Sequence, residues 1–262
     1  VQFNIYIEQI APTNTKCLIN GEDLSYYGVF LTDVNVPEGL ETNTKFLQVD
    51  GTDTNTAYQQ NIKEKTITVE FDIGDCALTS STNSLRELTR LLTNKRNKYN
   101  QPIPNTIEFE HYPDVYWEYI MESPLDTELE VSTYKVKAKL TVPSGTAYDK
   151  NSTTTNNTGY VSGLAPVNPV ITFKPTTDTI SITEEISGQK FNMGYNGDWQ
   201  NGIVEIDCDN RTVTLKNDED DDTGTDLTPY VDFNSAWFVL YEEYEFTTVN
   251  CLIRTITYNE RW

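Results

Sequence analysis

The alternation of apolar and polar residues is the strongest pattern in the chain, and it predicts β-strands. In residues 65–73 (KTITVEFDI) and 134–142 (YKVKAKLTV), every second residue is apolar. Such a period of two places one face of a strand in a core and leaves the other face in water. The first residues of the chain alternate in the same way, with Val1, Phe3 and Ile5 on one face, so we expect a strand there as well.

Short strand signals separated by turns continue through the rest of the chain. The sequence DCDNRT at 207–212 lies between two alternating segments and predicts a tight hairpin, because Asn and Asp favour turn conformations. Residues 235–262 are aromatic and β-branched and predict two or three more strands. These features indicate a mainly β protein of two β-sandwich domains, the N-terminal one carrying a single α-helix.

One segment, SLRELTRLLTNKRNK, has the period of a helix, with its leucines on one face. Ser84 and Glu87 have the spacing of a capping box at its start. Lys95, Arg96 and Lys98 gather at its predicted end, where the helix dipole favours cations. These cations either stabilise the helix and keep the protein soluble, or dock on an acidic face of a neighbouring subunit. Because of the second alternative, they are candidate interface residues.

Residues 144–163 lack any apolar period and consist mostly of Ser, Thr, Asn and Gly. This composition predicts a linker or a long mobile loop. We therefore expect an N-terminal domain at 1–145, a linker at 146–163 and a C-terminal domain at 164–262.

Composition limits the classes of function. The 262 residues are 37% hydrophobic, enough for packed cores, and their net charge of −21 predicts repulsion from nucleic acid. The longest apolar run, residues 236–241, is far shorter than the roughly 18 residues of a membrane-spanning helix, so no membrane contact is expected. The single histidine, His111, excludes multi-histidine metal sites, and the 4 separated cysteines are expected to be buried thiols.

The most acidic stretch, KNDEDDDTGTD, invites comparison with a calcium-binding loop. Asp218, Asp220 and Asp222 match the first three ligand positions of an EF-hand. Thr223, however, stands where glycine is needed, and Pro229 stands where the final glutamate is needed. We expect a solvated turn, with weak calcium binding as the alternative, and no other metal site.

No arrangement of residues predicts catalysis. No serine lies in a GxSxG motif, and no glycine-rich phosphate loop or distinctive carboxylate pair is present. We therefore expect a protein that is not an enzyme and needs no cofactor. Trp199, in the sequence GYNGDWQNG, is a candidate for a weak glycan contact by stacking; alternatively it covers the end of a sandwich or an interface.

Residues 17–55 carry a recognisable series of features. After a strand signal come the pairs Asn20–Gly21 and Tyr27–Gly28, a proline segment and a turn containing glycine. The strand YQQNIKEKTITVEFDI and the leucine-striped helix follow in order.

The end of the chain adds a late hairpin (NGIVEIDCDNRTVTLKN) and a Tyr-x-Glu-Arg-aromatic finish at Tyr258, Glu260, Arg261 and Trp262. In this order the features resemble the distal tail protein (Dit) family of long-tailed siphovirus phages of Gram-positive bacteria. The turn at 49–54 departs from the family's pGrdG-like pattern, because its second glycine and its basic residue are absent.

The resemblance implies a structural role in the virion. Members of the family form a homohexameric ring at the tip of the tail tube, through which DNA passes. Such a ring contacts the tail tube protein, the tail-tip hub or tail-associated lysin protein, and in some cases a receptor-binding protein. The resemblance also implies that the N-terminal domain builds the ring, that the C-terminal domain is galectin-like, and that assembly occurs in the host bacterial cytoplasm.

Two interfaces and two other functions are open at this point. The cations Lys95, Arg96 and Lys98 are one candidate interface, and the N-terminal strand, pairing with a neighbour's sheet edge, is the other. The first alternative function is that of another tail tube or baseplate structural protein. The second is that of a carbohydrate-binding module that recognises a bacterial wall polymer through the C-terminal sandwich.

Overall fold

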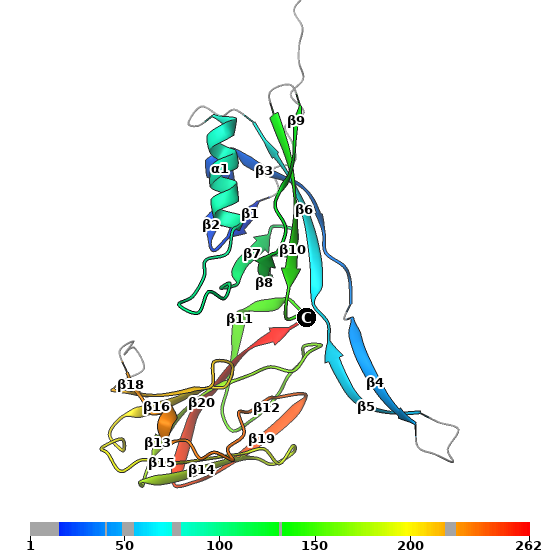
Figure 1. The fold of residues 1–262 in the computed structure, drawn as a ribbon. Helices are drawn as coiled ribbons and strands as arrows, with labels where there is room; N and C mark the ends of the chain where they lie inside the picture. Colours follow the sequence, from blue (N-terminus) through cyan, green and yellow to red (C-terminus); the bar gives the residue numbers. More distant parts are fainter. Residues whose placement is uncertain (1–15, 40, 49–54, 75–79, 131–132, 218–223) are drawn as a thin grey trace, which may run out of the picture. The chain divides into compact units, whose positions relative to one another are not determined.

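In the computed structural model the chain divides into two compact units, Val1–Ala147 and Tyr148–Trp262 (Figure 1). The structure describes residues 16–39, 41–48, 55–74, 80–130, 133–217 and 224–262. Both units are mainly β, and within the described residues the one α-helix belongs to the N-terminal unit, which confirms the predicted fold class. The strand expected at the start of the chain lies outside the described residues.

The N-terminal unit consists of two antiparallel sheets, a helix and a separate hairpin. Its elements are β1 (Cys17–Ile19), β2 (Glu22–Asp23), η1 (Leu24–Tyr27), β3 (Val29–Asn35), β4 (Thr42–Gln48), β5 (Asn55–Ile62), β6 (Lys65–Ile73), α1 (Ser81–Leu92), β7 (Asn105–Phe109), β8 (Val115–Met121), β9 (Asp126–Glu130) and β10 (Thr133–Val142). One sheet has the order β3-β6-β10-β9, the other has the order β2-β1-β7-β8, and they join where β8 pairs with β10. Among the described residues, β4 and β5 pair only with each other.

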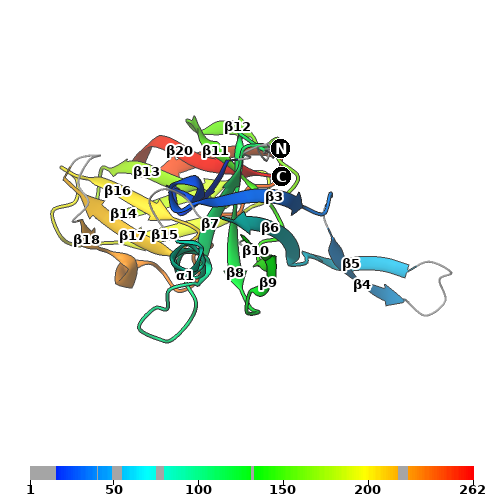
Figure 2. The ribbon, with the colours of Figure 1, turned by 90° about the horizontal axis from the view of Figure 1, so that it is seen from above.

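The alternating residues of β6 and β10 form the centre of the N-terminal core. Ile67, Val69 and Phe71 are fully buried, and in the pairing of the two strands Val69 lies opposite Ala138. The helix α1 contacts β3, β6 and β10 and covers the inner face of their sheet (Figures 1 and 2). Each large apolar side chain that is fully buried here contributes about 1.5–3 kcal/mol to folding.

The helix occupies a different range from the predicted one. It begins at Ser81, after the N-cap Ser80, so the expected capping box at Ser84 is wrong. Ser84 lies inside the helix, is fully buried, and donates its hydroxyl hydrogen bond to the carbonyl of Ser80. The expected leucine stripe is confirmed, with Leu88 fully buried against the core.

The helix also ends earlier than predicted, at Leu92, because Thr93 adopts an extended conformation. The side chain of Asn94 then donates to the carbonyls of Ile103 and Tyr119, both at 3.0 Å. These hydrogen bonds hold the chain after the helix in a non-helical conformation. The cations that were expected on the last helical turn therefore lie in the loop that follows.

The C-terminal unit is a sandwich of two antiparallel sheets. Its elements are β11 (Tyr148–Thr155), β12 (Thr158–Tyr160), β13 (Val170–Pro175), β14 (Thr179–Glu184), β15 (Lys190–Gly194), β16 (Ile203–Asp207), β17 (Thr212–Lys216), β18 (Thr225–Asp226), η2 (Thr228–Tyr230), β19 (Glu243–Val249) and β20 (Cys251–Arg261). One sheet has the order β18-β17-β16-β13-β20-β11 and the other has the order β12-β19-β14-β15. This arrangement is compatible with the galectin-like sandwich that the resemblance implies.

The segment expected to be a linker is largely strand, so that expectation is wrong for β11 and β12. The backbone of β11 pairs with β20, and Thr154 lies opposite Thr257 with their hydroxyls 3.3 Å apart. None of the residues of β11 is fully buried, so the strand needs no apolar period. Its threonines fit a strand through their β-branched side chains, a preference that the polar composition concealed.

The predicted hairpin around DCDNRT is confirmed. It joins β16 and β17, with Ile206 opposite Val213. The carboxylate of Asp207 accepts hydrogen bonds from the backbone N–H groups of Asp209 and Asn210, at 3.0 and 2.9 Å. Arg211 takes the left-handed conformation that closes the turn, with φ 55°.

Candidate functional site

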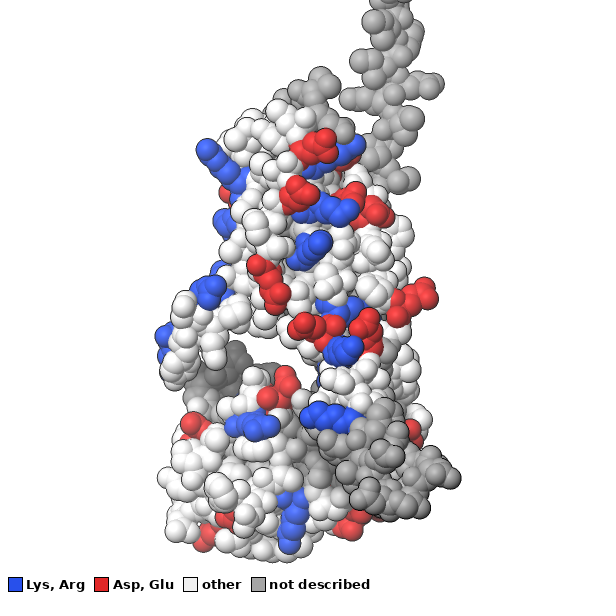
Figure 3. All heavy atoms as spheres, turned by 45° about the vertical axis from the view of Figure 1, so that its right-hand side comes forward, with Lys and Arg blue, Asp and Glu red and all other residues white. Residues whose placement is uncertain are grey.

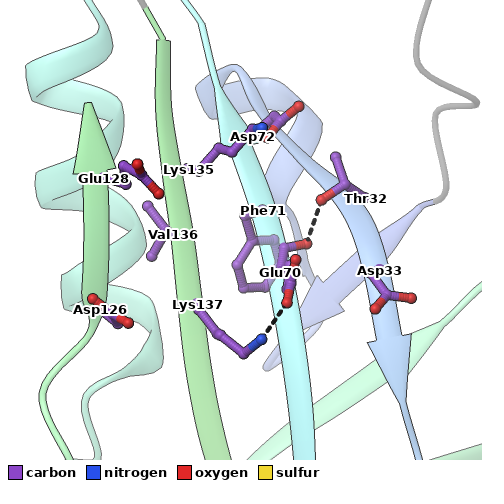
Figure 4. Close-up of a pocket in the computed structure, with 10 residues that line it drawn as sticks. All are labelled: Thr32, Asp33, Glu70, Phe71, Asp72, Asp126, Glu128, Lys135, Val136 and Lys137. Atoms are coloured by element: carbon purple, nitrogen blue, oxygen red, sulfur yellow. Dashed lines mark hydrogen bonds and ion pairs between the residues drawn. The ribbon is translucent and has the colours of Figure 1, made fainter. Parts of the chain in front are cut away.

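The outer face of the sheet β3-β6-β10-β9 carries a concentrated set of charges. We call it the charged sheet face, and it consists of Asp33, Glu70, Asp72, Asp126, Glu128, Lys135 and Lys137 (Figure 4). Those on β6 and β10 alternate with the core residues of these strands, so the strand period that buries one face places the charges on the other. Figure 3 shows acidic and basic side chains interleaved on this side of the N-terminal unit.

Strand register places each of these lysines between two carboxylates. Lys137 on β10 lies opposite Glu70 on β6 and opposite Asp126 on β9. Lys135 lies in the same way between Asp72 and Glu128. Opposite charges on directly facing positions stabilise the pairing of strands, whereas like charges would weaken it.

A further carboxylate, Asp33 on β3, lies opposite Glu70 and has no lysine facing it across the pairing. The charged sheet face therefore carries more carboxylates than lysines. The next residue along β10 on this side, Lys139, lies opposite Thr68.

The ion pair of Lys137 with Glu70 is the closest contact on the charged sheet face (Figure 4). The hydrogen bond to Glu70 and the nearby carboxylates of Asp33 and Asp126 raise the pKa of the Lys137 ammonium. Lysine is charged at neutral pH without such help, so the pair changes the local field and not the protonation state at pH 7. Both side chains are nearly half exposed, at 48% and 42%, which limits what the pair contributes to stability.

The charged sheet face surrounds an open hollow of about 470 Å³. The hollow is lined mainly by charged groups that are neutralised in part by one another, and none of the described residues that line it is serine, cysteine or histidine. Its charged lining therefore suits electrostatic steering or repulsion.

The predicted interface cations remain together, but they lie in a loop. Lys95, Arg96 and Lys98 are all exposed and follow the end of α1. The other predicted interface residues, Val1, Phe3 and Ile5, lie outside the described residues.

The predicted glycan contact at Trp199 is wrong. The side chain is fully buried in the C-terminal core, and its indole N–H donates to the carbonyl of Thr177 at 2.9 Å. The ring of Tyr195 covers it, with centroids 5.8 Å apart. A buried indole has no free face for a sugar.

Metal sites and reactive thiols are not found in the described part of the chain. No group of three or more His, Cys, Asp or Glu residues in that part could hold a metal ion. The acidic stretch with Asp218, Asp220 and Asp222 lies outside it. Cys208 and Cys251 are buried free thiols, and burial raises the pKa of each to about 12, which keeps them protonated and unreactive.

Sequence reasoning identified the ending Tyr258, Glu260 and Arg261 only as part of a resemblance and missed what it does. The Glu260 carboxylate accepts hydrogen bonds from the backbone N–H groups of Ser162 and Gly163. Arg261 donates to the carbonyl of Pro166 at 3.0 Å, and the Tyr258 hydroxyl donates to the carbonyl of Tyr160 at 3.1 Å. The motif thus fastens the segment after β12 to the last strand.

The comparisons with known proteins agree with this architecture. Residues 162–262 match the family model described as siphovirus-type tail component, C-terminal domain. The crystal structure of SPP1 Dit (gp 19.1), described as a paradigm of the hub adsorption apparatus in phages that infect Gram-positive bacteria, is similar with a TM-score of 0.70. The two sequences are 16% identical, and the similarity covers 95% of this chain and 99% of the SPP1 Dit chain. No curated protein matches the sequence.

The phage P2 baseplate in its activated conformation is also similar. The structure with Ca has a TM-score of 0.55 and 10% identity, over 94% of this chain and 98% of that chain. The structure with Sr has a TM-score of 0.56 and 11% identity, over 95% of this chain and 98% of that chain.

The chain thus has the mainly β fold of these phage tail proteins, and its residues 162–262 match a tail component model. The match of residues 162–262 to the siphovirus-type tail component model and the likeness to SPP1 Dit confirm the resemblance to the Dit family of phages of Gram-positive bacteria. Among the helices of the described residues, none is long and apolar enough to cross a membrane.

Proposed function

We propose that this protein forms a homohexameric ring at the tip of a phage tail. The ring joins the tail tube protein to the tail-tip hub or tail-associated lysin protein and to the receptor-binding apparatus, and DNA passes through it. The observation that carries the proposal is that nearly the whole chain has the fold of SPP1 Dit, while residues 162–262 match a siphovirus tail family. The protein acts in the virion after assembly in the host cytoplasm, and its role is structural and not enzymatic.

The N-terminal unit builds the ring in this proposal, and the C-terminal unit lies outside it. The charged sheet face is the surface suited to line the passage, because its carboxylates outnumber its lysines and repel DNA phosphates. The outermost strands of its sheet in the described residues are β3 and β9. Strand pairing with neighbouring copies at these edges would use backbone groups that are otherwise solvated.

Mass photometry and negative-stain imaging of the purified protein test the ring. We expect six-fold particles with an open centre as the concentration rises. Monomers at every concentration, also in the presence of the tail tube protein, would overturn the proposal.

A charge-neutralised variant tests the passage. Changing the five carboxylates of the charged sheet face to Asn or Gln should make the rings retain DNA at low salt, because the exposed lysines then face phosphate without competition. The control variant carries the same number of changes on exposed or half-exposed acids of the C-terminal unit: Glu185, Glu205, Asp209, Glu242 and Glu243. Equal DNA retention by the two variants would show that the position of the carboxylates is irrelevant.

A further inference from the structure

The loop between α1 and β7 has a composition opposite to that of the rest of the chain. Residues 93–104 contain Lys95, Arg96 and Lys98 and no acidic residue, although the whole chain has a net charge of −21. Figures 1 and 2 show the loop leaving the end of α1 and projecting away from the sheets before it returns to β7. We call residues 94–103 the basic loop.

The basic loop is held in one conformation by its own asparagines. The side-chain oxygen of Asn97 accepts hydrogen bonds from the backbone N–H groups of Tyr99 and Gln101, at 2.9 and 3.0 Å. The backbone of Asn97 also donates to the carbonyl of Gln101 at 2.9 Å, and Asn100 takes the left-handed conformation with φ 64°. Asx turns of this kind are a local substitute for strand or helix hydrogen bonds.

Asn94 fastens the base of the basic loop to the N-terminal core. Its side chain donates to the carbonyls of Ile103 and Tyr119 and accepts from the backbone N–H of Met121 at 2.7 Å. Tyr119 is fully buried. The loop is therefore anchored to the sheet β2-β1-β7-β8, and a partner that binds it would find it already ordered, which lowers the entropic cost of association.

The cations of the basic loop have no acidic partner within the described part of the chain. Lys98 lies over the ring of Tyr99, with 5.0 Å between the ammonium nitrogen and the ring centroid. Tyr99 is 70% exposed, and the apolar side chain of Ile103 is 46% exposed. Tyrosine and arginine are enriched among the residues that dominate protein interfaces, and the basic loop exposes one of each, Tyr99 and Arg96.

We infer that the basic loop is the contact by which one copy of this chain docks on a carboxylate-bearing surface of the neighbouring copy. This inference rests on the proposed ring. Copies with a charge of −21 repel one another, and cations placed where the copies meet would offset this repulsion. The basic loop presents such cations without neutralising them internally, and the neighbouring copy supplies an excess of carboxylates.

Charge reversal of the loop tests the inference directly. The variant Lys95→Glu, Arg96→Glu and Lys98→Glu should raise the concentration at which rings form about tenfold or more. The matched control reverses two lysines and one arginine that are exposed in the C-terminal unit, namely Lys174, Lys190 and Arg211. It has the same net charge and should assemble nearly as well as the wild type.

A second variant separates loop geometry from charge. Asn97→Ala keeps all three cations and removes the side-chain hydrogen bonds that order the loop, and we expect a smaller loss of assembly in the same direction. The double variant Lys95→Arg and Lys98→Arg retains the charges and the loop geometry and should assemble as the wild type does. Circular dichroism of each variant checks that the monomer remains folded.

Zero-length carbodiimide cross-linking of a mixture of isotopically light and heavy protein identifies the partner. We expect mixed-isotope peptides that join Lys95 or Lys98 to Asp or Glu residues. Rings that form equally well with the reversed loop, or that lack these cross-links, would overturn the inference and leave the proposed ring intact. A wild-type protein that stays monomeric at every concentration, also with the tail tube protein present, would overturn both, because the loop then recruits no second copy.

Discussion

The carboxylate of Glu260 accepts a hydrogen bond from the backbone N–H of Gly163, with 2.7 Å between the oxygen and the nitrogen. Its other oxygen accepts from the backbone N–H and the hydroxyl of Ser162, at 3.0 and 3.1 Å. Gly163 lies so close to the last strand that an added Cβ would stand 2.5 Å from the carbonyl oxygen of Arg261. The last strand therefore holds a segment that enters the sandwich far earlier in the chain.

Replacing Glu260 by alanine should lower the free energy of unfolding of the C-terminal unit by about 2–4 kcal/mol, because two backbone N–H groups would lose a charged acceptor. Urea unfolding followed by tryptophan fluorescence measures the change. The exposed Glu243, changed to alanine, is the control and should have little effect. An equally small effect at Glu260 would mean that water replaces the carboxylate without loss.

Glu184 should make the free energy of unfolding of the C-terminal unit depend on pH in the acid range. Burial opposes ionisation of its carboxyl, but hydrogen bonds from Ser187, Ile186 and Glu245 together hold its pKa below the ordinary value of 4.5. The folded state thus binds its proton less readily than the unfolded state. The resulting stabilisation is present above pH 4.5 and is lost as the pH falls through the lowered pKa.

The measurement compares urea unfolding of the wild type and of Glu184→Gln between neutral and acid pH. The difference in stability should be largest near neutrality and shrink below pH 4.5. A difference that stays constant with pH would contradict the role of the charged carboxylate.

Trp199→Ala should destabilise the C-terminal unit by about 3–5 kcal/mol, because it leaves a large cavity and an unpaired carbonyl at Thr177. Trp199→Phe, which keeps most of the volume but not the hydrogen bond, should cost less. Thermal unfolding measures both. Unfolding temperatures unchanged from the wild type would show that the side chain is exposed in solution.

Neighbouring residues on β6 should respond in opposite ways to truncation. Phe71→Ala removes a fully buried ring and should cost about 3–5 kcal/mol. Glu70→Ala removes an exposed ion pair with Lys137 and should change stability little. Similar losses at both positions, measured by urea unfolding under the same conditions, would mean that the outer face of this sheet is covered and not solvated.

Periodicity alone determined the strands that have one buried face. The alternation in β6 and β10 and the apolar segments around the 207–212 turn each predict their own structure, because burial of every second side chain is a local consequence of strand geometry. The leucine stripe of α1 is equally local, and the colinear motifs were enough to point to the Dit family.

The tertiary structure alone decided the features that depend on residues distant in the sequence. β11 is a strand because β20 lies beside it, and Trp199 is buried because Tyr195 and Thr177 surround it. On the charged sheet face, which carboxylate lies opposite which lysine depends on the register in which the strands pair. No local sequence pattern specifies that register. The sequence determined which residues are apolar enough to be buried in a core. The pairing of the strands determined which charged residues lie opposite one another.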